Sequence, residues 1–205
     1  MKALHDYIIT TDNRYNNTVD VEGKELIVNT EITERDAEFV NRIATVIATP
    51  ASKESAIQVG DDVIVHHNVF RRWYDMRRNE KNTAAFIDDN TFVISEDQVF
   101  AYRRDGEWKA TLKYCFVEPI VDKSMFKDKR YEELKGVLRI TDDYLDSLGI
   151  KIGTTVGFTP ESEYEFTIDD KILYRIYSTH LTIDYGLQER KTENNSVEQE
   201  STSSA

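Results

Sequence analysis

The side chains best suited to chemistry gather in one basic, aromatic segment, Val69 to Lys81, with the sequence VFRRWYDMRRNEK. Aromatic rings that stack on bases and arginines that bind phosphates are a common way to hold single-stranded nucleic acid. The whole chain, however, has 38 acidic and 26 basic side chains and a net charge of -12, which repels a phosphate backbone. We therefore expect no nucleic-acid partner. We expect these aromatic rings to pack on the protein or on a neighbouring subunit, and the secondary-contact candidates are Phe70, Arg71, Arg72, Trp73 and Tyr74.

The other polar clusters predict neither an enzyme nor a metal site. His66 and His67 are adjacent, and neighbours on a strand point to opposite faces, so they do not form a ligand pair. The only cysteine, Cys115, lies between two aromatic residues and is expected to be a buried apolar side chain. We expect no catalytic residue, no metal and no cofactor. Three carboxylate pairs fall at turns, where aspartate accepts backbone hydrogen bonds: Asp61-Asp62, Asp88-Asp89 and Asp169-Asp170.

The elements that carry these residues are mostly strands. Short segments rich in Val, Ile, Tyr, Phe and Thr recur along the chain, which is typical of small barrels and sandwiches. Helical patterns are confined to short connectors at 33–43 and at 141–148, where Thr141 is the expected N-cap. Residues 188–205 hold a single aliphatic residue and are expected to be a disordered tail. No segment reaches the roughly 20 apolar residues of a membrane span, so we expect a cytoplasmic protein without membrane contact.

The sequence repeats itself. Ile57–Val65 matches Ile150–Phe158, and both place a glycine at a tight turn that leads into a strand. Three further matches keep the same order: Leu4–Ile9 with Phe116–Val121, Thr45–Ile47 with Gly136–Leu138, and Ile87–Asp89 with Ile168–Asp170. Four ordered matches predict a duplication, with one domain at 1–108, an insertion in it at about 66–85, and a second, diverged domain at 112–187.

Three motifs in the first copy resemble the GroES-type co-chaperonins. They are Leu4-His5-Asp6 before an apolar strand, the Val59-Gly60-Asp61 turn, and the Ser95-Glu96 pattern before Val99, and the resemblance spans nearly all of residues 1–103. It implies two tandem small, irregular β-barrels. It also implies a homo-oligomeric ring that caps the chamber of a GroEL-type chaperonin ring, where ATP hydrolysis belongs to the partner. The short connection at 49–56 suggests a roof that is open, as in virus-encoded members.

The resemblance also implies a chaperonin-binding mobile loop at about 11–41, with the docking triplet Leu26-Ile27-Val28. Composition agrees, because the triplet stands in a polar stretch that begins at Asp12, Asn13 and Arg14. The alternative is that the triplet is another strand of the barrel. Met125 and Phe126 are candidates for a second docking element.

Two other functional classes stay open. A virion or scaffold component could use the same barrel only to assemble, with the second copy and the Arg71–Lys81 segment as its contacts. A single-strand nucleic-acid binder is the weaker of the two, because of the charge.

Overall fold

A computed structural model describes residues 2–15, 18–21, 24–27, 40–111, 113–122, 131–169 and 171–187, with the backbone alone for 18–21 and 25–27. These residues are mainly β-strand, as the sequence predicts. The predicted tail at 188–205 lies outside the described residues.

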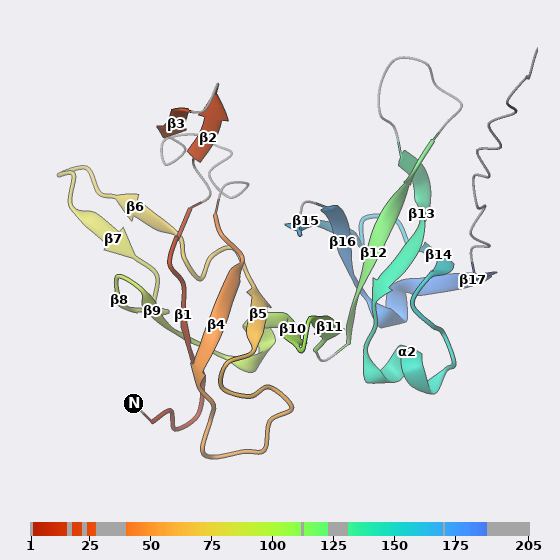
Figure 1. Cartoon of the computed structure of the whole chain (residues 1–205), viewed down its shortest axis with the longest axis horizontal. Coiled ribbons are helices and arrows are strands. Elements are labelled where there is room, and N and C mark those ends of the chain that lie inside the picture. The colour runs from red at the N-terminus through yellow and green to blue at the C-terminus, as the bar shows by residue number, and fades with distance from the viewer. Residues whose placement is uncertain are drawn as a thin grey trace, which may run out of the picture.

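The first half of the chain forms an antiparallel sheet of seven strands (Figure 1). Within the described residues no pairing joins its two outer strands, so the sheet is open and is not a closed barrel. In β4 the alternation of Ala44, Val46 and Ala48 toward the interior shows why this segment becomes a half-buried strand. Its spatial order is β11 (Glu107–Ala110), β10 (Val99–Arg104), β5 (Asp62–Val65), β4 (Ile43–Ala48), β1 (Tyr7–Thr10), β9 (Thr91–Ile94) and β8 (Phe86–Asp88).

The second half forms an antiparallel sheet of six strands, which is also open within the described residues. Its outer strands are β15 and β17. Strand β14 is buried along its whole length, since all five of its residues are inaccessible. The spatial order is β15 (Tyr164–Ile168), β16 (Lys171–Tyr177), β12 (Tyr114–Val121), β13 (Tyr131–Ile140), β14 (Thr154–Phe158) and β17 (Leu181–Leu187).

The two sheets have the same topology, which supports the predicted duplication. Strands β10-β5-β4-β1-β9-β8 correspond in space and in chain order to β17-β14-β13-β12-β16-β15. A short 3-10 turn precedes β10 at Glu96–Gln98, and another precedes the equivalent strand β17 at Ser178–His180. Gly60 and Gly153 both have a positive φ, and their N–H groups donate at 2.8 Å to the carbonyls of Val46 and Leu138 on equivalent strands.

Two of the four sequence matches are wrong in register. Thr45 pairs with Asp62, and Val137 pairs with Thr155, the residue equivalent to Asp62, so the match of Thr45–Ile47 with Gly136–Leu138 is shifted by one residue. Tyr7 pairs with Ile94 and Tyr114 pairs with Tyr177, and these partners directly precede Ser95 and Ser178. Tyr7 is therefore equivalent to Tyr114, which shifts the match of Leu4–Ile9 with Phe116–Val121 by five residues. Leu4–Ile9 and Phe116–Val121 both mix apolar residues with charged or polar ones, so composition alone does not fix the alignment.

The equivalent connections differ in length. Between β1 and β4 lie residues 11–42, which include the hairpin of β2 (Thr18–Val21) and β3 (Lys24–Ile27). Between β12 and β13 lie only residues 122–130. The insertion predicted in the first half contains a second separate hairpin, formed by β6 (Arg72–Tyr74) and β7 (Glu80–Asn82).

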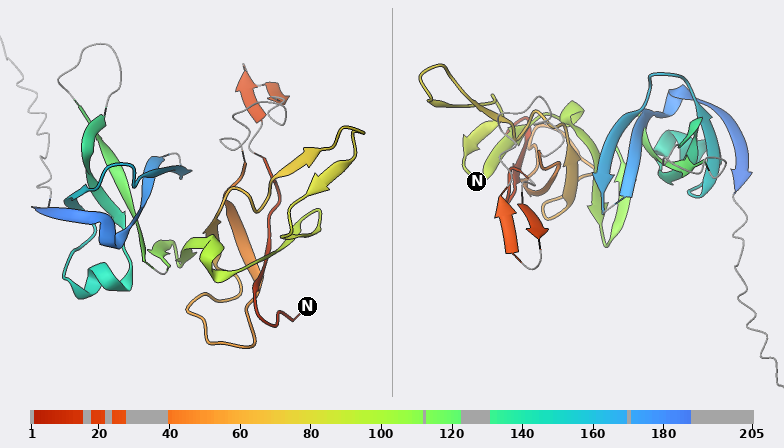
Figure 2. Two further views of the ribbon diagram at one scale, coloured as in Figure 1. Left: turned by 180° about the vertical axis from the view of Figure 1, so that it is seen from behind. Right: turned by 90° about the horizontal axis from the view of Figure 1, so that it is seen from above.

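The two halves pack directly on one another and lie side by side in both views of Figure 2. The first sheet ends at Ala110 and the second begins at Tyr114. One hydrophobic cluster takes Ile64 and Phe100 from the first half together with Phe116 and Phe166 from the second. Across the same junction the guanidinium of Arg175 lies 4.7 Å from the ring of Phe100. One further hydrophobic cluster fills the interior of the first half, and another fills the interior of the second half.

Among the described residues there is one α-helix, α2 (Asp143–Ser147), inside the predicted 141–148. Its N-cap is Asp142 rather than Thr141, because the Asp142 side chain accepts the N–H of Leu145. Most of the other predicted helix, 33–43, lies outside the described residues, and Ile43 begins β4. No helix in the described part of the chain is long and apolar enough to cross a membrane.

Candidate functional site

Two residues of the docking triplet predicted from the sequence, Leu26 and Ile27, lie in a hairpin that stands apart from both sheets (Figure 1). Leu26 and Ile27 belong to β3, where Leu26 is opposite Val19 and Ile27 is opposite Thr18 of β2. Val28 is outside the described residues. In the described chain β3 pairs only with β2, so Leu26 and Ile27 are not in a strand of either large sheet.

The base of the 16–39 segment is fixed by buried residues. Tyr15 and Val40 form an isolated antiparallel bridge, and both side chains belong to the core of the first half. Asn41 closes the base from the side: its amide Nδ2 donates to Thr11 Oγ1 at 2.9 Å and to the carbonyl of Asn13 at 2.8 Å. The long segment therefore leaves and re-enters the sheet at a defined place.

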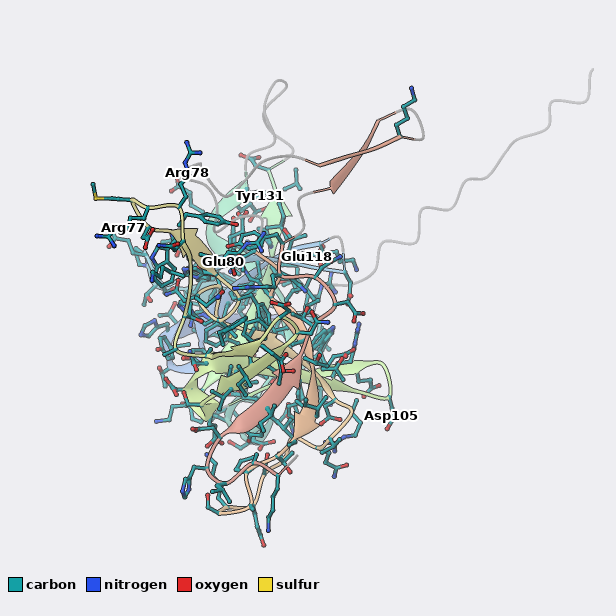
Figure 3. The ribbon with its side chains drawn as sticks, turned by 90° about the vertical axis from the view of Figure 1, so that its left-hand side faces the viewer. Arg77, Arg78, Glu80, Asp105, Glu118 and Tyr131 are labelled. Atoms are coloured by element: carbon teal, nitrogen blue, oxygen red, sulfur yellow. The ribbon has the colours of Figure 1, made fainter. Side chains whose placement is uncertain are left out.

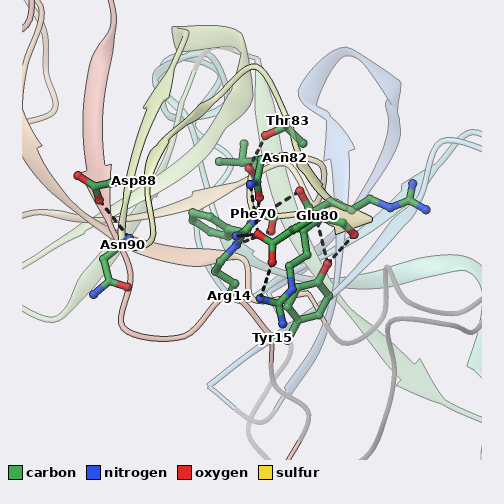
Figure 4. Close-up of polar contacts among 11 residues, drawn as sticks. Arg14, Tyr15, Phe70, Glu80, Asn82, Thr83, Asp88 and Asn90 are labelled. Atoms are coloured by element: carbon green, nitrogen blue, oxygen red, sulfur yellow. Dashed lines mark hydrogen bonds and ion pairs between the residues drawn. The ribbon is translucent and has the colours of Figure 1, made fainter. Parts of the chain in front are cut away.

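Arg14 was expected in a solvated stretch, and this prediction is wrong. Its side chain is only 10% exposed, and its pKa is lowered, first by burial and then by the neighbouring charge of Arg72. Its Nε donates to the carbonyl of Phe70 at 3.0 Å and its Nη2 to Asn82 Oδ1 at 2.6 Å (Figure 4). The partners lie more than 50 positions further along the chain, so no local pattern marks this role.

The residues proposed as a secondary contact separate into buried and exposed groups. Phe70 is fully buried and packs edge to face on Phe92, with ring centroids 4.8 Å apart, so it belongs to the core. Trp73 and Tyr74 are 47% and 49% exposed on β6. Arg71 is exposed and Arg72 is half-buried, 3.7 Å from Glu80. The other candidates, Met125 and Phe126, lie outside the described residues.

The two adjacent histidines do not point to opposite faces, which corrects the expectation from strand geometry. Strand β5 ends at Val65, so His66 and His67 lie in the following turn, where their ring centroids are 4.3 Å apart. Burial and the charges of Arg42 and Arg175 lower the pKa of His66. His67 Nδ1 lies 2.7 Å from the hydroxyl of Tyr164, so this turn contributes to the junction between the halves.

The remaining titratable groups have structural surroundings. Cys115 is fully buried, and burial raises the pKa of its thiol to about 12, so little nucleophilic thiolate exists at neutral pH. In the residues that the structure describes, no three His, Cys, Asp or Glu side chains gather in a way that could hold a metal ion. As predicted for turns, Asp61 accepts the N–H of Gln58 at 2.8 Å and Asp88 accepts that of Asn90 at 3.2 Å.

No model of a known protein family matches this chain, and no curated protein sequence is detectably similar to it.

Proposed function

We propose that this chain is a GroES-like co-chaperonin, in which each sheet corresponds to one GroES-like unit. In this proposal the chain binds a GroEL-type chaperonin ring through the Leu26-Ile27-Val28 segment, assembles into a ring of its own and closes the folding chamber. Its motif resemblance covers the first half, and the repeated topology supports a second unit of the same kind.

The observation that carries the proposal is the position of the β2–β3 hairpin. It extends from a rigid base at Tyr15 and Val40 and is paired with no other described strand, so Leu26 and Ile27 are available to a partner without disturbing either sheet. A short docking segment binds weakly on its own, and a ring that presents several copies raises the overall affinity through effective concentration.

Changing Leu26, Ile27 and Val28 together to alanine tests the proposal. We expect the triple variant to lose binding to a purified GroEL-type chaperonin in the presence of nucleotide, because the apolar side chains that enter the partner are removed. Binding is measured by surface plasmon resonance, and the circular-dichroism spectrum is expected to match that of the wild type.

The matched control changes three apolar residues that are exposed elsewhere, Leu4, Val59 and Ile152, to alanine. We expect this control to bind like the wild type. A wild-type protein that does not bind would refute the proposal. A triple variant that unfolds would assign the segment to the core.

A second candidate function, a structural or assembly protein without a chaperonin partner, is favoured by strand β17. This strand lies at the edge of its sheet, pairs only with β14 among the described strands, and exposes Ile183, Tyr185 and Leu187. An edge strand with exposed apolar residues can pair with another chain. Oligomers in light scattering, together with no chaperonin binding in surface plasmon resonance, would favour this candidate.

A further inference from the structure

The β6–β7 hairpin is a second projecting element of the first half. We refer to residues 71–82, with strands β6 and β7 and the turn between them, as the β6–β7 arm. In the described chain its strands pair only with each other, and the arm extends from the same end of the first sheet as the β2–β3 hairpin (Figure 1). A partner held by one hairpin is therefore within the neighbourhood of the other.

The arm and the β2–β3 segment share one base (Figure 4). Arg14 donates hydrogen bonds to the carbonyl of Phe70, which directly precedes the arm, and to the side chain of Asn82, at the end of the arm. The Tyr15 hydroxyl accepts the N–H of Arg72 at 2.9 Å. Arg14 and Tyr15 are also the last described residues before β2, so the same two side chains fix the arm and the start of the docking segment.

The tip of the arm is preformed. The carboxylate of Asp75 accepts the backbone N–H groups of Arg77 at 2.8 Å and of Asn79 at 2.9 Å, and the Asn79 side chain adds a third hydrogen bond at 3.2 Å. Because these bonds fix the turn before any partner arrives, binding loses little conformational entropy.

The tip presents an apolar residue between cationic ones. Met76 is fully exposed, and Figure 3 shows Arg77 and Arg78 pointing outward. Neither arginine side chain has an acidic partner within ion-pair distance in the described part of the chain. Methionine, arginine and aromatic residues are the types enriched where proteins bind proteins, and Trp73 and Tyr74 add exposed ring surface on β6.

Charge indicates the nature of the partner. The arm has five basic and two acidic side chains, a net charge of +3 in a chain whose total is -12. A cationic tip on an otherwise acidic protein is attracted to an acidic protein surface, whereas the rest of the chain repels a nucleic-acid backbone.

We propose that the β6–β7 arm is a second docking element, which places Met76, Arg77 and Arg78 on an acidic protein surface with an apolar recess, on the same partner that binds the Leu26 segment. This inference rests on the proposed function. The arm supplies a rigid, charge-dependent contact, and the β2–β3 hairpin supplies the apolar one.

The test compares a variant with Met76→Ala, Arg77→Glu and Arg78→Glu with the full-length wild type. Binding to the purified GroEL-type chaperonin with nucleotide is measured by surface plasmon resonance at low and at high salt. We expect the arm variant to bind at least about tenfold more weakly at low salt, with a smaller difference at high salt, because salt screens exposed charges. The control reverses two exposed charges elsewhere, Lys2→Glu and Lys151→Glu, and is expected to bind like the wild type.

Each other outcome has a defined meaning. A wild type that binds, with an arm variant that binds equally tightly, overturns the arm inference and leaves the proposed function standing. A wild type that fails to bind overturns both. An arm variant that changes only the oligomer size in light scattering, or only retention on a single-stranded oligonucleotide column, overturns the inference in favour of a second copy of this chain or of nucleic acid.

Discussion

Asp61 is a buried carboxylate that connects the turn before β5 to strand β10. Its oxygens accept from Arg104 at 2.6 and 2.9 Å and from the N–H of Gln58 at 2.8 Å. Burial acts to raise the pKa of Asp61, but the hydrogen bonds from Arg104 and Gln58 together outweigh it, and the pKa is lowered. The charged form therefore stabilises the turn that leads into β5.

We expect Asp61→Asn to lower the free energy of unfolding at pH 7 by about 1–3 kcal/mol, because a buried charged partner of Arg104 is lost. The stability contributed by the charge is fully present above the unfolded pKa of about 3.9 and is lost as the pH falls through the lower folded pKa. Urea denaturation at pH 7 and below pH 4 measures the difference, which shrinks at the lower pH. Asp105→Asn, at an exposed turn, is the control, and an Asp61 effect that persists in acid contradicts this assignment.

At the scale of elements, helix α2 depends on one side chain. Asp142 is 1% exposed, and its two carboxylate oxygens accept the N–H of Leu145 at 2.9 Å and the Ser178 hydroxyl at 2.7 Å. It thereby joins the start of α2 to the turn before β17. Leu145, in the first turn of the helix, is buried in the core of the second half.

Asp142→Ala is expected to lower the free energy of unfolding by about 1–3 kcal/mol, because the helix loses its N-cap and Ser178 loses its buried acceptor. Thr141→Ala is the matched control and is expected to change the stability little. Thermal denaturation followed by circular dichroism compares the two. A larger decrease in the free energy of unfolding for Thr141→Ala than for Asp142→Ala would show that Thr141 is the N-cap, as predicted from the sequence.

Local patterns in the sequence predict which secondary-structure elements form better than they predict which strands and side chains pair with one another. The β-rich fold, α2 and the paired glycine turns follow from propensity, capping and turn chemistry, all of which act over a few residues. The register of β12 could not be predicted, because it is set by pairing with β16 about 60 residues away. The role of Arg14 was missed for the same reason, since its partners Phe70 and Asn82 come from a distant hairpin.

At the scale of the whole molecule, the two halves pack against each other through a shared hydrophobic cluster and are not independent domains joined only by a linker. Phe166 of the second half lies between the two units, with its ring centroid 5.7 Å from that of Phe100 and 5.7 Å from that of Phe116. The ion pair between Arg103 and Asp169, at 3.3 Å, crosses the same junction. Separating the halves would expose these rings to water.

We expect the wild type to unfold in one calorimetric transition, with equal calorimetric and van't Hoff enthalpies, because unfolding of either half exposes the hydrophobic cluster that the two halves share. Phe166→Ala is expected to lower the free energy of unfolding by about 3–5 kcal/mol and to keep a single transition. Ile87→Ala, at an exposed position, is the control. Two transitions, of which only the second shifts in Phe166→Ala, would show that the halves fold independently.

The unequal connections between equivalent strands set the valency of any assembly built from this chain. The 32 residues between β1 and β4 include the β2–β3 hairpin, whereas the equivalent connection between β12 and β13 has nine residues. In the proposed ring, each chain would contribute two sheets to the wall but only one long hairpin to the rim. In that proposed complex, a partner ring with one binding site for each sheet would have a hairpin at only every second site.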